Sequence, residues 1–400
     1  MLRKLTFSLL FPLAATHAAP PLQPLIDATP AGGALRPAPG VYAGPAVIGK
    51  PMTLDGQGKV TLEGSGKGSV LTLAASGATL RGLRLTHSGD SHDGVDAGLL
   101  VAGDDNLVEN NAIDDVLFGI HVRQGNRNRI LNNRVAGRPA PRGARGDGLR
   151  LWNSRHNRVE GNAFRTIRDL TFANSPDNRI LRNTLTDGRY GMHFVFSPRA
   201  QVEGNRLSDT DTGIVVLYSP ELVLRNNTVA HALDGGGAGI AFKDSGNALV
   251  EGNEILHCAA GLSANAPVND EAVLTVRGNR FAHNVVGMYF YGEKGGHRIT
   301  GNRFENNLTQ VAVSAAGAGE ANAWRGNAWS DYQGFDRDGD GIGDTPHEIW
   351  LYSDRIWMET PRAKFFANSP ALELLDLLER LAPFASPTLI LRDAAPRMAK

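Results

Sequence analysis

The sequence predicts an all-β fold, a right-handed parallel β-helix, and a recurring phrase carries that prediction. VEGNAF at 159–164 returns as VEGNRL at 202–207, VEGNEI at 250–255, VRGNRF at 276–281 and ITGNRF at 299–304. Weaker copies lie before, between and after these. Steps of 21 to 29 residues separate the asparagines in the fourth position. Repeats of this length are units of a solenoid, because one unit is too small to bury its own apolar face.

The second observation is that each repeat consists of short strands and turns. About nine residues after the asparagine comes a second strand, as in GIVV at 213–216 and GMYF at 287–290. No repeat contains an amphipathic helical stretch, which argues against helical repeats as the source of the period. Equivalent positions of a parallel β-helix stack ~4.8 Å apart. A column of stacked asparagines then bridges neighbouring coils through its side-chain amides. These anchor asparagines are Asn111, Asn133, Asn162, Asn183, Asn205, Asn227, Asn253, Asn279, Asn302 and Asn327.

Composition and the N-terminal stretch predict an exported protein. Residues 1–18 resemble a signal peptide, with Arg3 and Lys4 before an apolar run and small residues ending at Ala18. The 41 basic and 41 acidic residues balance, which gives no indication of nucleic-acid binding. The single cysteine, Cys258, excludes an internal disulfide, so this thiol is either buried or a ligand.

The solenoid is expected to span 19–330 as ten or more coils, mostly of about 22–26 residues. A basic loop, RPAPRGARG at 138–146, leaves one corner between Asn133 and Asn162. Residues 331–400 form a closing region with an Asp/Gly-rich loop, a helix and a tail. SPALELLDLLERLA at 369–382 is predicted to be a capping helix, because Ser369 suits the N-cap and leucines form one stripe.

One turn column carries the main candidate metal site. Four residues after the anchor, three successive coils present His231, His257 and His283, and Cys258 follows the second of them. Imidazole binds copper or zinc and thiolate binds Cu(I), so these four residues are candidate copper ligands. The alternative is a polar turn ladder in which histidine replaces Asp or Asn, because other coils place those residues there. Met192 and Met288 fall in an inward apolar column and are assigned to the core.

A second signal is an apolar stripe on the outward positions of the middle coils. A stacked stripe of exposed apolar residues marks a docking face for a partner protein, unless a terminal segment of the chain covers it. The predicted stripe consists of Trp152, Phe172, His193, Val195, Val215, Leu217, Tyr289 and Tyr291.

The closing region contains a candidate calcium loop. Asp336, Asp338, Asp340 and Asp344, with Gly341, follow the first nine positions of an EF-hand loop. His347 breaks that pattern at position 12, and no flanking helices are predicted. We therefore expect either a structural Ca²⁺ loop or an Asp/Gly-rich turn in which carboxylates cap backbone amides.

The chain resembles the NosD family. The resemblance rests on TLDGQG at 53–58, the anchored coils, WSDYQGFDRDGDGIGD at 329–344 and the tail around SPTLILRD at 386–393. It implies a periplasmic β-helical protein, not an enzyme, that supplies copper, expected as Cu(I), to apo-nitrous oxide reductase. The implied partners are an inner-membrane ABC transporter permease with its ATPase and a copper chaperone.

Two other functions stay open. A scaffold could dock the reductase without binding metal. A carbohydrate-active lyase, hydrolase or epimerase could share the fold, but it would need outward acids and a base in one groove. We find no outward groove in the sequence pattern that combines several acids with arginine and aromatic residues.

Overall fold

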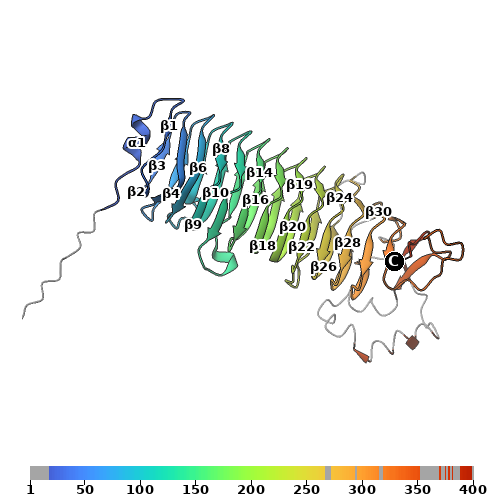
Figure 1. Ribbon diagram of the computed structural model, residues 1–400. Coiled ribbons are helices and arrows are strands. Elements are labelled where there is room, and N and C mark those ends of the chain that lie inside the picture. Colours follow the sequence, from blue (N-terminus) through green and yellow to red (C-terminus); the bar gives the residue numbers. More distant parts are fainter. Residues whose placement is uncertain are drawn as a thin grey trace, which may run out of the picture.

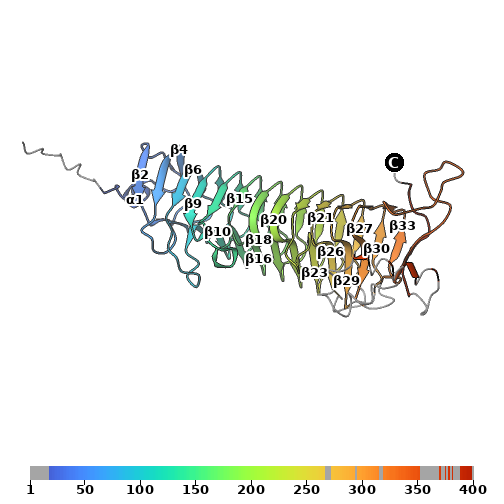
Figure 2. The same ribbon diagram turned by 90° about the horizontal axis from the view of Figure 1, so that it is seen from below.

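Three parallel sheets wind along one axis in the computed structural model and form an elongated rod (Figures 1 and 2). The predicted right-handed parallel β-helix is therefore confirmed. The structure describes residues 18–265, 272–292, 295–314, 319–351, 369–370, 374, 377–378, 381 and 388–398. The predicted signal peptide lies outside these residues, apart from Ala18.

The first sheet contains the residues that precede each anchor. Its strands in sequence order are β1 (Ala34–Leu35), the first part of β4 (Thr53–Glu63), the first part of β6 (Thr79–Thr86), β8 (Leu107–Glu109), β11 (Arg129–Leu131), β14 (Arg158–Glu160), β17 (Arg179–Leu181), β19 (Gln201–Glu203), β21 (Val223–Arg225), β24 (Leu249–Glu251), β27 (Thr275–Arg277), β30 (Arg298–Thr300) and β33 (Ala323–Arg325).

The second sheet follows the anchors. Its strands are β2 (Gly40–Ala43), the second parts of β4 and β6, β9 (Ala112–Val116), β12 (Arg134–Gly137), β15 (Ala163–Arg165), the first parts of β18 (Thr184–Val195) and β20 (Arg206–Leu217), β22 (Thr228–Ala230), β25 (Glu254–Leu256), β28 (Arg280–Ala282), β31 (Arg303–Glu305) and β34 (Ala328–Trp329).

The third sheet carries the predicted outward stripe. Its strands are β3 (Ala46–Ile48), β5 (Leu71–Leu73), β7 (Ala97–Val101), β10 (Phe118–Arg123), β13 (Leu149–Trp152), β16 (Asp169–Ala173), the second parts of β18 and β20, β23 (Ile240–Lys243), β26 (Ala260–Asn265), β29 (Val286–Tyr291) and β32 (Thr309–Val313).

Buried amides join the coils at the turn between the first and second sheets. Asn205 illustrates the pattern: its backbone N–H and its Nδ2 both donate to Oδ1 of Asn227, at 3.0 and 2.9 Å. Nδ2 also donates to the carbonyl of Ile180 at 2.9 Å. The anchors are 0–2% exposed, so these hydrogen bonds replace water for groups that the turn would otherwise leave unsatisfied.

The glycine of the phrase VEGN has a backbone role. The residue before each anchor is left-handed, with φ of +66° at Gly204 and +63° at Gly252. Glycine adopts this conformation without steric cost, and asparagine tolerates it better than most residues. Asn132 and Asn226 occupy the same position in other coils, with φ of +55° and +52°. The repeated phrase therefore encodes the turn as well as the ladder.

Inward columns from all three sheets form the core. Met192 and Met288 are fully buried in it, as predicted, beside Ile214 and Leu262 in one column. At the N-terminal end the short helix α1 (Gln23–Ala28) covers the first coils through the buried Leu22 and Ile26. Helix α1 lies at the start of the rod in Figure 1.

An antiparallel pair, β35 (His347–Leu351) and β36 (Thr388–Asp393), closes the other end. The described positions of the predicted helix 369–382, among them Leu374, Leu378 and Leu381, are helical or lie at its first turn. The leucines described there are 47–73% exposed. The remaining helix residues lie outside the described chain.

Candidate metal ladder and docking surface

His231, His257 and His283 stack at the corner between the second and third sheets, as the spacing predicts. The ring centroids of His231 and His257 lie 5.6 Å apart, and those of His257 and His283 lie 5.2 Å apart. The ring planes are inclined by 28° and 12°. All three side chains are exposed to solvent. We call these three residues the histidine ladder.

The backbone explains why this column is polar. The three histidines are left-handed, with φ of +59°, +53° and +57°. Asp, Asn and His are the non-glycine residues most often found there, and Asp209 and Asn306 occupy the same column. The left-handed turn therefore explains why this column is polar. The same turn leaves the rings exposed, so it is compatible with metal binding.

The same column holds Asp187 and Asp209 in the two preceding coils, and the basic loop 138–146 pairs with Asp187. Arg145 contacts Asp187 at 3.1 Å and Arg142 contacts it at 3.3 Å. Although burial opposes the shift, the hydrogen bond and charge of Arg145 hold the pKa of Asp187 below its usual range. Asp209 lies 3.5 Å from Nδ1 of His231, at the boundary between the acidic part and the histidines.

Cys258 does not belong to the exposed ladder, which corrects that part of the predicted ligand set. The side chain one residue beyond a corner histidine points into the core, and Cys258 is fully buried. Its Sγ donates to the carbonyl of Leu256 at 3.3 Å. Burial raises the pKa of the Cys258 thiol to about 11, so it is protonated at neutral pH and is a poor metal ligand.

The three rings do not converge on one point. A metal site of this kind needs ligand atoms from at least three His, Cys, Asp or Glu side chains close together. Among the residues that the structure describes, Asp336, Asp338 and Asp340 bring such atoms within 4.8 Å of one another, and the three histidines do not. The parallel stacking instead brings the imidazoles together as two overlapping pairs. Because the rings are exposed, rotation about Cβ–Cγ can turn the nitrogens of one pair toward a shared ion.

The prediction that Phe172 belongs to the outward docking stripe is wrong. It is fully buried, and its ring stacks on Phe194 with centroids 4.6 Å apart. The coil from Asn162 to Asn183 is one residue shorter than the next, and the pairing of β16 with β18 shifts between Asp169 and Thr171. A slip of one residue moves a strand side chain to the opposite face.

The other stripe residues lie on the outward face, but they form separate groups. Trp152 is exposed, Val195 and Leu217 are half-buried neighbours, and Val215 is 8% exposed. Tyr289 and Tyr291 stack on each other, with Ser263 and Asn265 beside them one coil earlier. The sequence analysis missed Phe196 and Tyr218, which stack at 5.1 Å and are 54% and 42% exposed. Both follow the strand directly at left-handed positions, outside the columns considered.

A polar cluster lies under the outward face of the third sheet and was not predicted. Asp147 is 1% exposed and pairs with Arg168 at 2.8 Å, while Arg189 pairs with Asp169. Burial raises the pKa of Asp147. His193, one of the predicted stripe residues, is half-buried, its ring packs edge-on against Tyr190 at 5.2 Å, and burial lowers its pKa. These residues come from consecutive coils, which no local motif connects.

His121 occupies the same outward column and is 3% exposed. Its Nε2 is buried without a hydrogen-bond partner, as is Nε2 of His193. Burial, reinforced by the positive charges of Arg150 and Arg123, lowers the pKa of His121 to about 4. Both rings are therefore neutral at physiological pH.

The Asp/Gly-rich loop forms a compact turn. Asp336 accepts hydrogen bonds from the backbone N–H groups of Gly339 and Gly341, at 2.7 and 2.8 Å. The bond from Gly341 is the main cause that lowers the pKa of Asp336. Asp338 and Asp340 lie with Asp336 in the acidic group described above, whereas Asp344 accepts from the N–H of Arg337. This geometry fits the amide-capping interpretation and leaves three carboxylates grouped.

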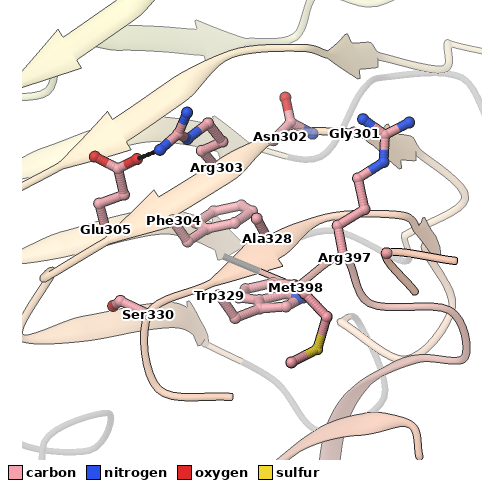
Figure 3. Close-up of a pocket in the computed structure, with 11 residues that line it drawn as sticks. Gly301, Asn302, Arg303, Phe304, Glu305, Ala328, Trp329, Ser330, Arg397 and Met398 are labelled. Carbon is pink, nitrogen blue, oxygen red and sulfur yellow. Dashed lines mark ion pairs between the residues drawn. The ribbon is translucent and has the colours of Figure 1, made fainter. Parts of the chain in front are cut away.

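A pocket beside the last coils is lined by Met398, whose thioether is a further soft metal ligand. Figure 3 shows Met398 of the tail beside Trp329 of the solenoid, while the Arg397 side chain points toward Gly301. The Trp329 ring stacks on Phe304 at 4.3 Å and on His347 at 4.8 Å. The pocket therefore has an aromatic wall at the closed end of the rod.

No helix in the described part of the chain is long and apolar enough to cross a membrane. The fold and the corner ladder define the class: a β-helical protein with exposed imidazoles that suit metal binding. Its sequence relationships are more specific. The model of the family described as "Periplasmic copper-binding protein (NosD)" matches residues 131–334, and the chain belongs to the NosD family.

Two curated relatives carry the name "Probable ABC transporter binding protein NosD". The protein from Pseudomonas aeruginosa is 31% identical over 96% of this chain and 92% of its own length. The protein from Stutzerimonas stutzeri is 26% identical over 86% of this chain and 82% of its own length.

Solved structures share the fold at low sequence identity. The A-module of mannuronan C-5 epimerase AlgE6 from Azotobacter vinelandii has a TM-score of 0.58 at 13% identity, covering 78% of this chain and 95% of that module. The catalytic domain of a GH87 alpha-1,3-glucanase has a TM-score of 0.56 at 15% identity, covering 73% of this chain and 65% of the domain. At these identities the similarity establishes the architecture alone.

Proposed function

We propose that this protein is a periplasmic accessory factor in nitrous oxide reductase maturation and passes copper to the apo-enzyme. The observation that carries the proposal is the stack of three exposed imidazoles on successive coils. The description of the family as periplasmic and copper-binding supports it, as do the relatives named for an ABC transporter. The accessory role is non-catalytic, with copper as cargo.

Neutral imidazole is the form that binds copper. Each neighbouring pair of the ladder, His231 with His257 or His257 with His283, would hold one Cu(I) ion through two ring nitrogens. Exposure of the pair makes the ion accessible to a second protein. With Cys258 buried, the ladder offers nitrogen ligands without thiolate, which favours release over tight storage.

The proposed partner proteins would supply ATP hydrolysis and copper. The sequence has no G-x-x-x-x-G-K-[ST] motif, so ATP-driven work would come from the ATPase of an inner-membrane ABC transporter, with its permease. A copper chaperone would load the ladder and apo-nitrous oxide reductase would receive the ion. The outward groups Trp152, Val195 with Leu217, and Tyr289 with Tyr291 are proposed contact points for these proteins. Asp336, Asp338 and Asp340 are proposed to hold a structural Ca²⁺.

An anaerobic Cu(I) competition titration tests the copper site. The variant combines His231→Ala, His257→Ala and His283→Ala. A matched control is His156→Ala, because His156 is also exposed and left-handed, with φ of +58°. Stoichiometric binding that is lost in the triple variant and kept in the control supports the proposal.

Equal Cu(I) binding by the native protein and the triple variant would place copper elsewhere. The terminal pocket with Met398 would then be the next region to mutate. Absence of Cu(I) binding by the native protein would favour a scaffold that docks the reductase without metal. A scaffold also predicts that the triple variant supports reductase maturation at the native level.

The polar cluster on the third sheet favours one alternative, a carbohydrate-active enzyme. It combines buried Asp147 and Asp169 with Arg150, Arg168 and Arg189, and with Tyr190 and His193 on an outward face. The carboxylates are already paired with Arg168 and Arg189, which weakens them as a general acid and base. Assays on uronate polymers test this alternative: turnover abolished by Asp169→Asn would support an enzyme.

A further inference from the structure

The middle coils of the rod are strongly basic, although the chain as a whole is neutral. Residues 123–206 contain 17 arginines against six acidic residues, a net charge of +11. Residues 1–122 carry a net charge of −3, and residues 207–400 carry one of −8. The basic coils lie in the middle of the rod (Figure 1). A positive field confined to one stretch of an otherwise neutral surface attracts an anionic partner.

A groove on the outward face of the second sheet overlaps the basic coils. Two adjoining hollows, with volumes of about 370 and 610 Å³, share Ala112, Arg134 and Ala163 in their linings. One hollow reaches back to Gly82, and the other reaches forward to Thr186. Together they run along the rod over several successive coils. We call the two hollows the basic groove.

Small side chains form the floor of the basic groove, because two outward columns of the second sheet carry them. The register of the strands places in one column Ala112, Arg134, Ala163, Thr184 and Arg206. The column two residues later holds Asp114, Ala136, Arg165, Thr186 and Ser208. Side chains between the two columns point inward, as the buried Phe164 shows. The floor is therefore low between arginines that extend from different coils.

The arginines of the groove differ in their pairing. Arg84 donates to both carboxylate oxygens of Asp114, at 2.9 and 2.8 Å. Asp114 is the one carboxylate among the described residues that line the groove. Arg134 and Arg165 are exposed and form no ion pair with any residue in the described part of the chain. Two guanidinium groups are therefore available to the carboxylates of a ligand.

The same coils also stack like charges on the first sheet. Arg129, Arg158 and Arg179 lie in register on successive coils. Equivalent positions are ~4.8 Å apart, and like charges in opposed positions destabilise a sheet. Of these three, Arg158 pairs with Glu160. An anionic ligand bound to the basic coils would reduce this repulsion, which a merely solvated surface would leave in place.

We propose that the basic groove binds an acidic oligosaccharide, a chain of sugar units that carry carboxylates. Arg134 and Arg165 would each bind a carboxylate through paired N–H groups. Thr184 and Thr186 supply hydroxyls that can donate to and accept from sugar hydroxyls. The alanines of the floor would pack against the apolar faces of the sugar rings. This inference does not depend on copper binding.

The sheet itself favours a saccharide over an acidic peptide. Peptides often bind by adding a strand to an exposed sheet edge. Along the groove the strands β9, β12, β15 and β18 are each paired on both sides, so the backbone offers no free edge. A saccharide needs only side-chain contacts. Because Asp114 is held by Arg84, the groove has no free acid and base, and binding without hydrolysis is expected.

The test measures binding of an oligogalacturonate of defined length by isothermal titration calorimetry at physiological salt. The groove variant combines Arg134→Ala with Arg165→Ala. The matched control combines Arg129→Ala with Arg179→Ala, which removes the same charge from the same coils but on the first sheet. A neutral glucan oligosaccharide of the same length is the second probe. Circular dichroism of the full-length mature protein accompanies each variant.

The native protein should bind the oligogalacturonate saturably and the neutral oligosaccharide not at all. The groove variant should bind at least about tenfold more weakly, because it loses charge-assisted hydrogen bonds to two guanidinium groups. The control should stay within about twofold of the native protein, because distant charges are screened at this salt concentration. A second variant, Ala163→Tyr, fills the floor without changing the charge and should also weaken binding.

Native-strength binding by the groove variant overturns the inference. So does an equal loss in the groove variant and the control, which would show attraction to the basic coils as a whole. Absence of binding by the native protein also overturns it. Polyglutamate and vesicles of phosphatidylglycerol test the other anionic occupants. Tighter binding of either one, lost in the groove variant, would assign the groove to a peptide or a membrane surface instead.

Discussion

Asp393 accepts two hydrogen bonds from Asn327 through the same oxygen, Oδ2: one from the backbone N–H and one from Nδ2, both at 2.9 Å. Each earlier anchor makes the same pair of bonds to the next asparagine, as Asn302 does to Asn327. Asp393 is completely buried and comes from β36, more than sixty residues later. A carboxylate is an acceptor only, so it ends the ladder without needing another coil.

Asp393→Ala should therefore destabilise the end of the rod. It would leave the N–H of Asn327, its Nδ2 and the N–H of Gly326 without their acceptor. We expect the free energy of unfolding to fall by about 3–5 kcal/mol, because each buried unsatisfied donor costs about 1–3 kcal/mol. Thermal unfolding followed by tryptophan fluorescence measures this, since Trp329 also contacts Asp393. Asp234→Ala, at an exposed position, is the control, and equal midpoints for the two variants would contradict the capping role.

Phe172→Ala should act on stability and not on partner binding. Removing a buried aromatic ring typically costs about 3–5 kcal/mol, because the surrounding core does not collapse fully into the cavity. Trp152→Ala, one coil earlier and exposed, should change the free energy of unfolding by less than about 1 kcal/mol. Chemical denaturation of both variants tests the inward assignment. A small effect of Phe172→Ala would mean that this ring lies on the surface.

The folded protein should lose stability in acid through His121. Its pKa is about 4 in the folded state, because of burial and then of Arg150 and Arg123, against an ordinary value of 6.5. As pH falls below 6.5 the unfolded chain takes up a proton that the folded chain refuses. The free energy of unfolding is therefore unaffected by His121 above pH 6.5. It falls progressively toward pH 4, by up to about 3 kcal/mol.

His121→Gln should flatten that part of the stability profile. Unfolding free energies measured from pH 7.5 to 4 should show a smaller decline for the variant than for the native protein. His156→Gln, at an exposed position, should leave the profile unchanged. Parallel curves for the native protein and His121→Gln would show that this ring does not govern the acid response.

Cys258→Ala should leave Cu(I) stoichiometry unchanged. The thiol is buried, and its pKa is raised to about 11. A thiol-specific reagent should label the native protein far more slowly than the denatured protein, because the thiolate is the reactive form. Loss of Cu(I) binding in Cys258→Ala, with unchanged circular dichroism, would return this cysteine to the ligand set.

Calcium should stabilise the closing region if the Asp/Gly-rich loop binds it. With Ca²⁺ at a hundred times the dissociation constant, binding adds about 2.7 kcal/mol to the folded state, which we expect to raise the melting temperature by about 2–5 °C. Asp338→Asn should remove this shift without lowering the metal-free melting temperature, because Asp338 is exposed. Equal Ca²⁺ responses of the native protein and the variant would leave the carboxylates as amide caps only.

The order of stacked positions was predictable from the sequence, because a repeat of near-constant length places equivalent residues in register. Asn205 above Asn227 and His257 above His283 follow from counting alone, and the inward Met192 and Met288 follow from their column. A period of two along a strand then assigns the faces. Where one coil is a residue short, the same counting fails, and Phe172 shows the consequence.

Contacts between residues from distant coils depended on the tertiary structure. Arg142 reaches Asp187 and Asp211 from a loop whose path no repeat describes, and Asp393 returns to Asn327 from the tail. The sequence determined the repeating backbone, its asparagine ladder and the histidine column, since these depend on local spacing. The folded chain alone decided that Cys258 is enclosed and that Asp187 and Asp211 pair with arginines of the basic loop, because burial and ion pairing depend on neighbours from other coils.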